Sequence, residues 1–165
     1  DSQWCWDNFI NHRSILSAGN VRRQLVRMMG KMGITVVKSD YNSASYFTNI
    51  RKCLCAGLFQ QVAHLQRAGH YLTVKDNQVV SIHPSSVLDN KPAWVIFDEF
   101  VLTAKNYIRT VSSTRLEWLC ELAPHYFDLE NFPDGETKSE LESGFRRARQ
   151  ELEYAESKRS KKKKG

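Results

Sequence analysis

The chain has 165 residues, of which 41% are hydrophobic, and a formal charge of +6 from 24 basic and 18 acidic side chains. This size and apolar content fit one domain with a small appendage and exclude collagen-like and wholly disordered chains. No stretch approaches the ~18 consecutive apolar residues of a membrane-spanning helix, and the first residues do not form a secretory signal. Because the chain opens on a Trp-rich segment without an initiator Met, we expect it to be the C-terminal part of a longer polypeptide.

The charge is unevenly distributed along the chain. Residues 1–75 carry a net charge of +7, residues 76–116 are neutral, and residues 117–157 carry −7. Residues 158–165 then add six basic side chains and no acidic one, so the body of the protein is neutral and the tail sets the net charge. We expect the tail to be disordered. Its favoured role is a nuclear localisation signal, and the alternatives are a non-specific nucleic-acid tether or a solubilising end.

Helical periodicity dominates the first third of the chain. Residues 4–16 and 18–32 are predicted to form helices, and in the second of these the apolar residues fall on one arc. The opposite side carries Arg22, Arg23 and Arg27, which form either a solvated face or a helix face directed at phosphates. Gly33 is expected to end this helix, and a further apolar helix is predicted over residues 46–58.

Strand-like alternation follows, interrupted by turn residues. It predicts five strands, at residues 61–65, 70–74, 78–82, 94–103 and 107–111. Five short antiparallel strands with an irregular segment before the fourth are typical of the Greek-key OB-fold barrel. An SH3-like barrel and a small open sheet remain alternatives. The fold class expected is therefore α+β, a five-stranded OB-fold β-barrel preceded by helices and followed by further helices.

Two helices are predicted after the strands. Thr114 and Glu117 have the spacing of a capping box, which would begin a helix that covers the barrel. From residue 137 onward the chain is a charged helix with few apolar residues, which we expect to be a solvated extension supported by Glu–Arg pairs four residues apart. The expected segments are residues 1–48, 49–133, 134–157 and 158–165.

The motifs of common catalytic sites are absent from the sequence. It has no phosphate-cradling glycine loop, no nucleophile elbow and no zinc-protease motif. Asp98 and Glu99 are adjacent on a predicted strand and would point to opposite faces, so they do not form a facing pair. A zinc site built from Cys53, Cys55, His64 and His70 is disfavoured relative to buried structural cysteines. We therefore predict no catalytic residue, metal site or cofactor within this chain.

Nucleic-acid binding is the chemistry that remains. In OB-folds the loops that join strands one to two and four to five contribute to the binding surface. Here these are residues 66–71 and 104–109, and we expect them to lie near one another at one end of the barrel. In these loops, basic side chains are candidates for contacts with RNA phosphates, and aromatic side chains are candidates for stacking on bases. The predicted RNA-binding residues are Arg67, His70, Lys75, Lys105, Asn106, Tyr107 and Arg109. Tyr71 is a further stacking candidate, and the alternative is that Tyr71 or Tyr107 faces the core.

Several motifs resemble one known family. FVLTAKNYIR (residues 100–109), EWL (117–119) and APHY (123–126) resemble the C-terminal OB-fold region of DEAH-box ATP-dependent RNA helicases. GHYLTVKDNQVV (69–80), HPSSVL (83–88) and NHRS (11–14) are most similar to the member of the family that disassembles spliceosomes and serves ribosome biogenesis. The similarity covers roughly residues 4–133.

The resemblance implies an architecture and a set of partners. Residues 1–48 would be the last helices of a helical-bundle (ratchet) domain, and residues 49–133 the OB-fold with its covering helix. RecA-like domains upstream would bind ATP and Mg²⁺, and the C-terminal domains would close over single-stranded RNA. The implied partners are single-stranded RNA, G-patch proteins and the upstream helicase domains, without a membrane. The implied location is the nucleus and nucleolus, and also the cytoplasm.

A second function is compatible with the same sequence. The acidic segment 117–157 and the apolar groups around Tyr126, Phe127 and Phe132 would form a protein-interaction platform. Such a platform would dock G-patch activators or the helicase core without direct RNA contact. The two functions differ in whether the basic loops or the acidic segment makes the essential contacts.

Overall fold

The structure is a computed structural model, which describes residues 1–88, 90–127, 129–130 and 132–162, with the side chains of residues 155, 156 and 158–162 left aside. The chain divides into two units, Asp1–Ser43 and Ala44–Gly165. We describe each unit by itself.

The first unit contains two helices, α1 (Ser2–Asp7) and α2 (His12–Lys31). The break between them falls earlier than the sequence predicted, because Phe9 adopts a positive φ and the Asn11 side chain accepts a hydrogen bond from the backbone N–H of Ser14. Gly33, at φ 71°, ends α2 as predicted. The N–H of Ile34 donates to the carbonyl of Met29 at 2.9 Å, which completes a Schellman motif.

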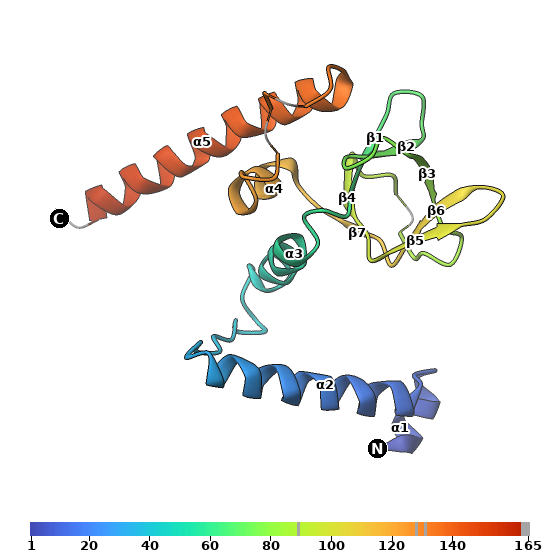
Figure 1. The fold of residues 1–165 in the computed structure, drawn as a ribbon. Helices are drawn as coiled ribbons and strands as arrows, with labels where there is room; N and C mark the ends of the chain where they lie inside the picture. The colour runs from blue at the N-terminus through green and yellow to red at the C-terminus, as the bar shows by residue number, and fades with distance from the viewer. Residues whose placement is uncertain (89, 128, 131, 163–165) are drawn as a thin grey trace. The chain divides into compact units, whose positions relative to one another are not determined.

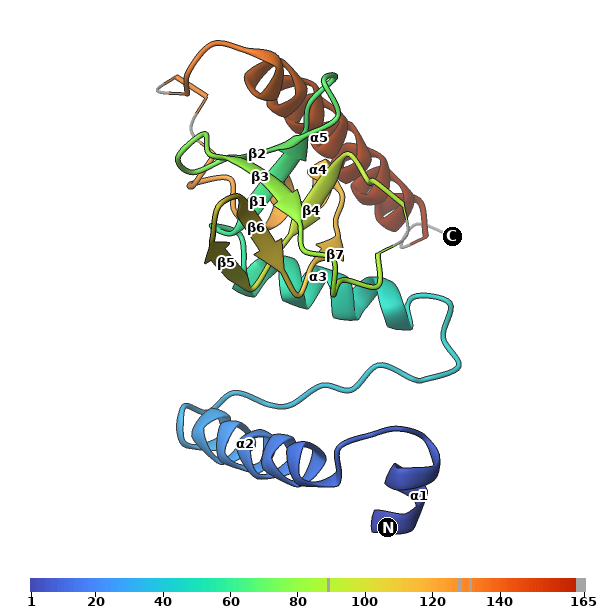
Figure 2. The ribbon, with the colours of Figure 1, turned by 90° about the vertical axis from the view of Figure 1, so that its right-hand side faces the viewer.

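Over its described residues, the second unit is built on a sheet of seven strands (Figure 1). They are β1 (Val62–Leu65), β2 (Tyr71–Thr73), β3 (Val79–Ile82), β4 (Trp94–Ile96), β5 (Glu99–Leu102), β6 (Asn106–Arg109) and β7 (Ser112–Ser113). Their order is β5-β6-β3-β2-β1-β4-β7, in which only the β3–β6 pair is parallel. β4 leads directly into β5, and β6 leads directly into β7. Each end strand of this order thus continues a strand from the opposite end, and the sheet curls into a barrel (Figure 2).

The expectation of five strands was wrong in count. The predicted strand 94–103 is divided between β4 and β5 by Phe97 and Asp98. The predicted strand 107–111 ends earlier, as β6 at Arg109, and a further strand, β7, follows it at Ser112–Ser113. Thr110, at φ 54°, makes the second break. Each bend lets one continuous stretch pair with two different neighbours, as the corners of a small barrel require.

Two hydrophobic clusters stabilise this unit. The barrel interior holds Ala63, Tyr71, Val80, Val95, Phe97 and Ile108. The other, which we call the helix-side cluster, lies between the outer side of β1 and β4 and the helices α3 (Tyr46–Gly57) and α4 (Leu116–Leu122). The helix predicted over residues 46–58 is confirmed as α3. Arg51 on α3 donates hydrogen bonds to the carbonyl and hydroxyl oxygens of Ser113, and its guanidinium lies 5.0 Å from the Trp118 ring centroid.

The start of α4 differs from the predicted capping box. Arg115 is the N-cap residue and its side chain makes no capping hydrogen bond. The Thr114 hydroxyl instead donates to the Cys55 sulfur at 3.5 Å, inside the cluster beneath the helix. The capping-box prediction was therefore wrong, because the Thr114 side chain is used in tertiary packing.

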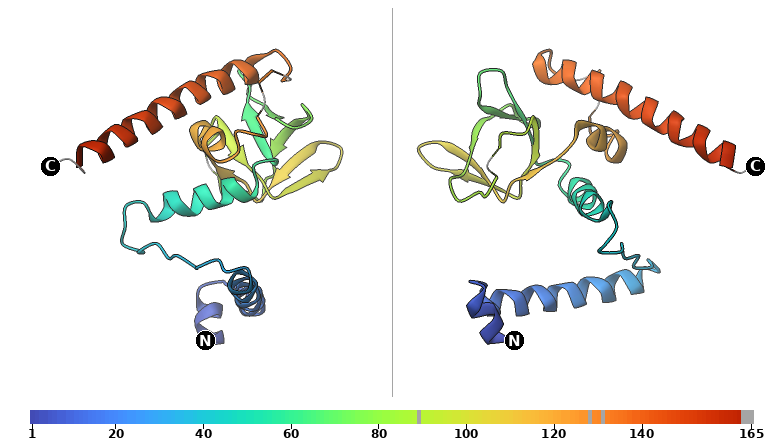
Figure 3. Two further views of the ribbon diagram at one scale, coloured as in Figure 1. Left: turned by 60° about the vertical axis from the view of Figure 1, so that its left-hand side comes forward. Right: turned by 180° about the vertical axis from the view of Figure 1, so that it is seen from behind.

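The charged C-terminal helix is α5 (Glu136–Lys162), and it is not a solvated extension. It packs against α4 (Figure 3), with Thr137, Leu141, Gly144 and Ala148 buried on one face at spacings of four, three and four residues. It also extends to Lys162, and so includes part of the segment that we expected to be disordered. The prediction failed because the buried stripe is made largely of small or polar residues.

Ion pairing on α5 also differs from the prediction. Among the described side chains, none of the expected Glu–Arg pairs four residues apart is formed. Arg147 instead donates to Glu117 on α4 at 2.7 Å. Burial by itself would raise the pKa of Glu117, but hydrogen bonds from its own backbone N–H and from Arg147, together with the charges of Arg147 and Arg115, leave that pKa below its usual value.

Gly144 allows α4 and α5 to approach closely. A Cβ at this position would lie 2.6 Å from Leu116 Cδ2 and closer still to its Cγ. We expect Gly144→Ala to destabilise the protein, since overpacking costs about 1–3 kcal/mol and the gain in helix propensity is about 1 kcal/mol. Thermal and urea unfolding would measure the change. Gly57→Ala on α3 is the matched control, because a Cβ there meets nothing within 4 Å. Equal stability of the two variants would contradict the close packing.

His64 joins β1 to the start of α5. Its ring stacks on Trp94 with centroids 4.3 Å apart, and its Nδ1 lies 3.0 Å from Gln66 Nε2 and 3.3 Å from the Thr137 hydroxyl. Burial lowers the pKa of His64, and the nearby Glu136 and Glu140 offset this effect only in part. The neutral ring is therefore favoured in the folded protein.

This shift predicts a pH dependence of stability. As pH falls below the ordinary histidine pKa of ~6.5, the unfolded chain takes up a proton before the folded protein does, so the free energy of unfolding decreases. The contribution of His64 to the slope cannot exceed about 1.4 kcal/mol per pH unit. Urea unfolding at several pH values between neutral and mildly acidic should show a shallower slope for His64→Gln than for the wild type. Parallel slopes would show that His64 is not the group responsible.

Candidate nucleic-acid interface

The barrel has one face that the helices leave open. In Figure 1, α3, α4 and α5 lie on the side of β1 and β4, and the β5–β6 hairpin projects on the other side. Along β2, β3 and β6, buried inward residues alternate with more exposed outward ones, as expected for strands covered on one side only. We define the open face by its outward side chains, which are Leu72, Val79, Ser81, Tyr107 and Arg109.

An aromatic pair lies at the centre of the open face. Tyr107 pairs with Ser81 across the β3–β6 ladder, and its ring packs edge-on against His83 with centroids 5.5 Å apart. His83 Nδ1 accepts a hydrogen bond from the backbone N–H of Ser85 at 3.1 Å and lies 2.7 Å from the Ser85 hydroxyl. The His83 ring is thus held in one orientation and supports the Tyr107 ring. A half-buried, supported aromatic ring on a sheet is the kind of platform on which a base can stack.

A cation lies beside this pair. Arg109 is outward-facing on β6, and its guanidinium lies 3.4 Å from the Glu99 carboxylate on β5. The two side chains are 49% and 51% exposed, so water screens the pair and the guanidinium can exchange partners at little cost. Asn106 is half-buried and donates its amide to the Val79 carbonyl at 3.4 Å, which is a long hydrogen bond.

The two loops do not converge at one end of the barrel, so this expectation was wrong. β2 and β3 are antiparallel and pair Tyr71 with Val80, whereas β3 and β6 are parallel and pair Ser81 with Tyr107. The β1–β2 loop therefore lies beyond the C-terminal end of β3. The β5–β6 turn lies at the N-terminal end of β3, where Asn106 reaches Val79. The loops flank the open face from opposite ends.

The candidate residues divide between these ends. Arg67 and His70 lie on the β1–β2 loop. Lys91, from the segment between β3 and β4, lies beside this loop, because its ammonium donates to the Gly69 carbonyl at 3.3 Å. The Arg67 side chain is 92% exposed, and its Nε lies 3.4 Å from Glu136 on α5. Lys75 and Lys105 are exposed at the opposite end, in the β2–β3 and β5–β6 turns. His70 is half-buried and lines a small hollow with Ser81 and Lys91.

Tyr71 is a core residue and not a stacking group. Its side chain is 2% exposed inside the barrel, and its hydroxyl donates to the Pro92 carbonyl at 2.8 Å. Burial raises the pKa of this hydroxyl. The alternative that one of the two tyrosines faces the core is therefore correct for Tyr71.

The basic residues of α2 belong to the first unit. Arg22, Arg23 and Arg27 are all exposed, and the Arg23 guanidinium donates to the Asn20 side-chain oxygen. No residue of α2 is buried, so these arginines remain a separate candidate surface.

The aromatic groups proposed for a docking platform are not free. Phe127 is 1% exposed, and Tyr126 and Phe132 pack against the helix-side cluster. The expectation of an exposed side chain is therefore wrong for Phe127, which is core, while Tyr126 and Phe132 are half-buried.

The residues that the structure describes contain no candidate metal site. No group of three or more His, Cys, Asp or Glu side chains is placed to hold a metal ion there. Cys53 is exposed, while Cys55 is buried and burial raises its pKa. In the same described part of the chain, no helix combines the length and the apolar character needed to cross a bilayer.

Sequence reasoning missed His83, Ser81 and Lys91 as members of the interface. The alternation along residues 79–82 could have placed Ser81 on the outer face. The position of His83 against Tyr107 depends on the parallel β3–β6 pairing, which is not local in sequence.

Comparison with known families agrees with this geometry. Residues 50–126 match the family model described as the oligonucleotide/oligosaccharide-binding (OB)-fold. This is the OB-fold domain found at the C-terminus of DEAH/RHA helicases. The chain therefore contains an OB-fold domain, and the match is consistent with a helicase C-terminal module that binds nucleic acid.

The different roles of the two tyrosines can be tested by deleting each hydroxyl. Tyr71→Phe leaves the Pro92 carbonyl without its donor and should lower the free energy of unfolding by about 0.5–1.5 kcal/mol. The same substitution at Tyr107 should change stability by less than about 0.5 kcal/mol, since this ring lies on the open face. Urea unfolding provides the measurement. A larger loss for Tyr107→Phe than for Tyr71→Phe would contradict the assignment.

Proposed function

We propose that this chain is the C-terminal RNA-binding and regulatory module of a DEAH-box ATP-dependent RNA helicase. The observation that carries the RNA-binding part is the open face, where Tyr107 is supported by His83 and flanked by Arg109. A ring for stacking, a cation for phosphate and a polar edge at Asn106 are the groups that single-stranded RNA requires. The match of residues 50–126 supports the helicase part.

RNA would run across the open face between the two loops. Arg67, His70 and Lys91 would contact it at one end, and Lys75, Lys105 and Asn106 at the other. Because cations lie at both ends of the face as well as beside the central ring, the face favours an extended single strand over a compact ligand. ATP and Mg²⁺ would bind to other domains of the intact helicase.

The cellular role is proposed on the sequence motifs alone. We propose that the helicase acts in pre-mRNA splicing, at spliceosome disassembly, and in ribosome biogenesis, with G-patch proteins as activators. The nucleus and nucleolus, and also the cytoplasm, are the proposed locations. The likeness of GHYLTVKDNQVV and HPSSVL to that member of the family supports this assignment.

Substitutions on the open face test direct RNA contact. Tyr107→Ala should weaken oligouridylate binding by about 1–3 kcal/mol, the usual range for one stacked base. Arg109→Gln should weaken it and lower the slope of log K against log salt by about 0.7. Glu99→Gln should strengthen binding, because Arg109 is then no longer neutralised. Fluorescence anisotropy at several salt concentrations would measure all three.

The control must remove the same charge on the covered side. Lys138→Gln is suitable, because Lys138 lies on α5 and pairs with Asp134 at 2.7 Å. Equal losses for Arg109→Gln and Lys138→Gln, with no effect of Tyr107→Ala, would show that RNA responds to net charge and not to the open face.

A further inference from the structure

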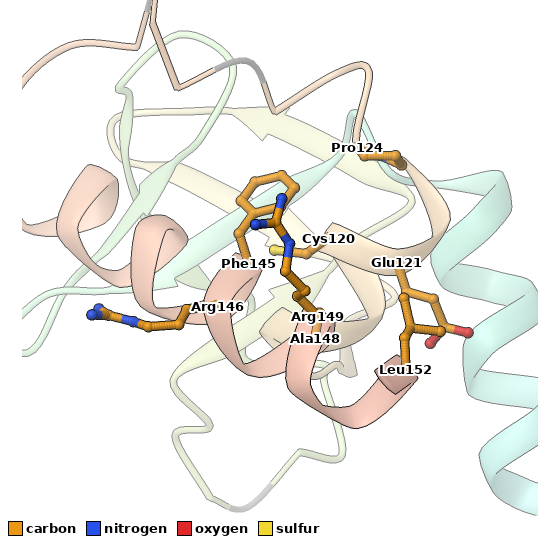
Figure 4. Close-up of a pocket in the computed structure, with 8 residues that line it drawn as sticks. All are labelled: Cys120, Glu121, Pro124, Phe145, Arg146, Ala148, Arg149 and Leu152. Atoms are coloured by element: carbon orange, nitrogen blue, oxygen red, sulfur yellow. The ribbon is translucent and has the colours of Figure 1, made fainter. Parts of the chain in front are cut away.

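A second surface lies on the helix side of the barrel. Residues from the end of α4 and from the middle of α5 enclose a hollow of ≈ 480 Å³ (Figure 4). Its lining residues are Cys120, Glu121, Pro124, Phe145, Arg146, Ala148, Arg149 and Leu152. None of them is part of the open face.

The floor of this hollow is apolar. Cys120 and Ala148 are buried, and Phe145 packs against the helix-side cluster. Burial raises the pKa of the Cys120 thiol to about 12, so the thiol is uncharged at neutral pH. Leu152 forms part of the wall and is 51% exposed, so apolar surface there is open to a partner. The hollow is therefore suited to a large apolar side chain.

The rim of the hollow is cationic. Arg146 and Arg149 line it from α5, and among the described side chains neither guanidinium has a carboxylate within ion-pairing distance. Glu121 is the one acidic lining residue, and its carboxylate already pairs with Lys52 on α3 at 2.7 Å. In Figure 4 the Arg149 guanidinium lies among the other lining side chains, whereas the Arg146 side chain extends away from them at the edge of the hollow. Arginine in this setting pairs well with carboxylates of a partner.

We propose that this hollow docks a partner segment in which large apolar residues are flanked by Asp and Glu. The apolar residue fills the space between Cys120, Phe145 and Leu152, and the acidic residues pair with Arg146 and Arg149. Apolar anchors with a rim of complementary charge are typical of peptide-binding surfaces. RNA fits less well, because phosphate and sugar would leave the apolar floor unfilled.

A labelled peptide can test this proposal on the full chain. The probe is a fluorescein-labelled peptide with a Leu-Phe pair flanked on both sides by Asp and Glu, and the comparison peptide has Ala-Ala in place of Leu-Phe. Because the basic residues 158–165 attract any acidic peptide, the comparison peptide measures the non-specific part. We expect the Leu-Phe peptide to bind roughly tenfold more tightly than the Ala-Ala peptide.

Two variants and one matched control locate the binding. Arg149→Glu alters the rim and Leu152→Ser alters the wall. Each should weaken binding of the Leu-Phe peptide by roughly tenfold and leave the melting temperature of the protein nearly unchanged. Lys75→Glu makes the same charge change in the β2–β3 turn and should leave peptide affinity within about twofold. Retained peptide binding by both variants, or equal binding of the two peptides, would overturn the proposal. A loss of oligouridylate affinity in Arg149→Glu as large as the loss of peptide affinity would overturn it as well, since the surface would then bind nucleic acid.

Discussion

Burial of β1 on both of its faces is the constraint on which the second unit depends. Val62 and Ala63 are neighbours in sequence and point to opposite sides of the sheet, yet both are buried. Ala63 contributes to the barrel interior, and Val62 to the cluster beneath α3 and α4. A strand covered on both sides fixes the register of its neighbours, because a slip of one residue would exchange the two clusters. The helices therefore determine which side of the barrel stays open.

Those parts of the fold that local periodicity controls could be predicted from the sequence. The helix over residues 46–58 and the first three strands were predicted within about two residues, because their apolar spacing and turn residues are local signals. The bends at Phe97–Asp98 and Thr110 were missed, since they arise when one strand must pair with two neighbours. The burial of α5 was missed because the signal was a stripe of Thr, Leu, Gly and Ala, in which Gly144 matters by having no side chain.

The binding face was predictable in its residue types but not in its geometry. Tyr107 and Arg109 lie on the open face because their positions on β6 follow the strand alternation, and Asn106 lies at the start of β6, beside the β5–β6 turn. Their neighbours could not be predicted, since the parallel pairing of β6 with β3 joins segments far apart in sequence. That same pairing places the loops at opposite ends, which converts an expected compact site into an extended one.

The ion pairs in the structure show which charged side chains are neutralised within the protein. Several basic side chains of the second unit are neutralised within the fold, as Arg147 is by Glu117 and Lys52 by Glu121. Acidic side chains of α4 thus form ion pairs within the fold, so the net charge of −7 on residues 117–157 does not by itself indicate a basic partner. The cations to which we assign ligands lie on two different sides of the barrel: Arg109, in an exposed pair with Glu99, lies beside an aromatic ring, and Arg146 and Arg149 line an apolar hollow. Because the barrel separates these surfaces, an RNA strand and an acidic peptide could bind at the same time without competing for a side chain.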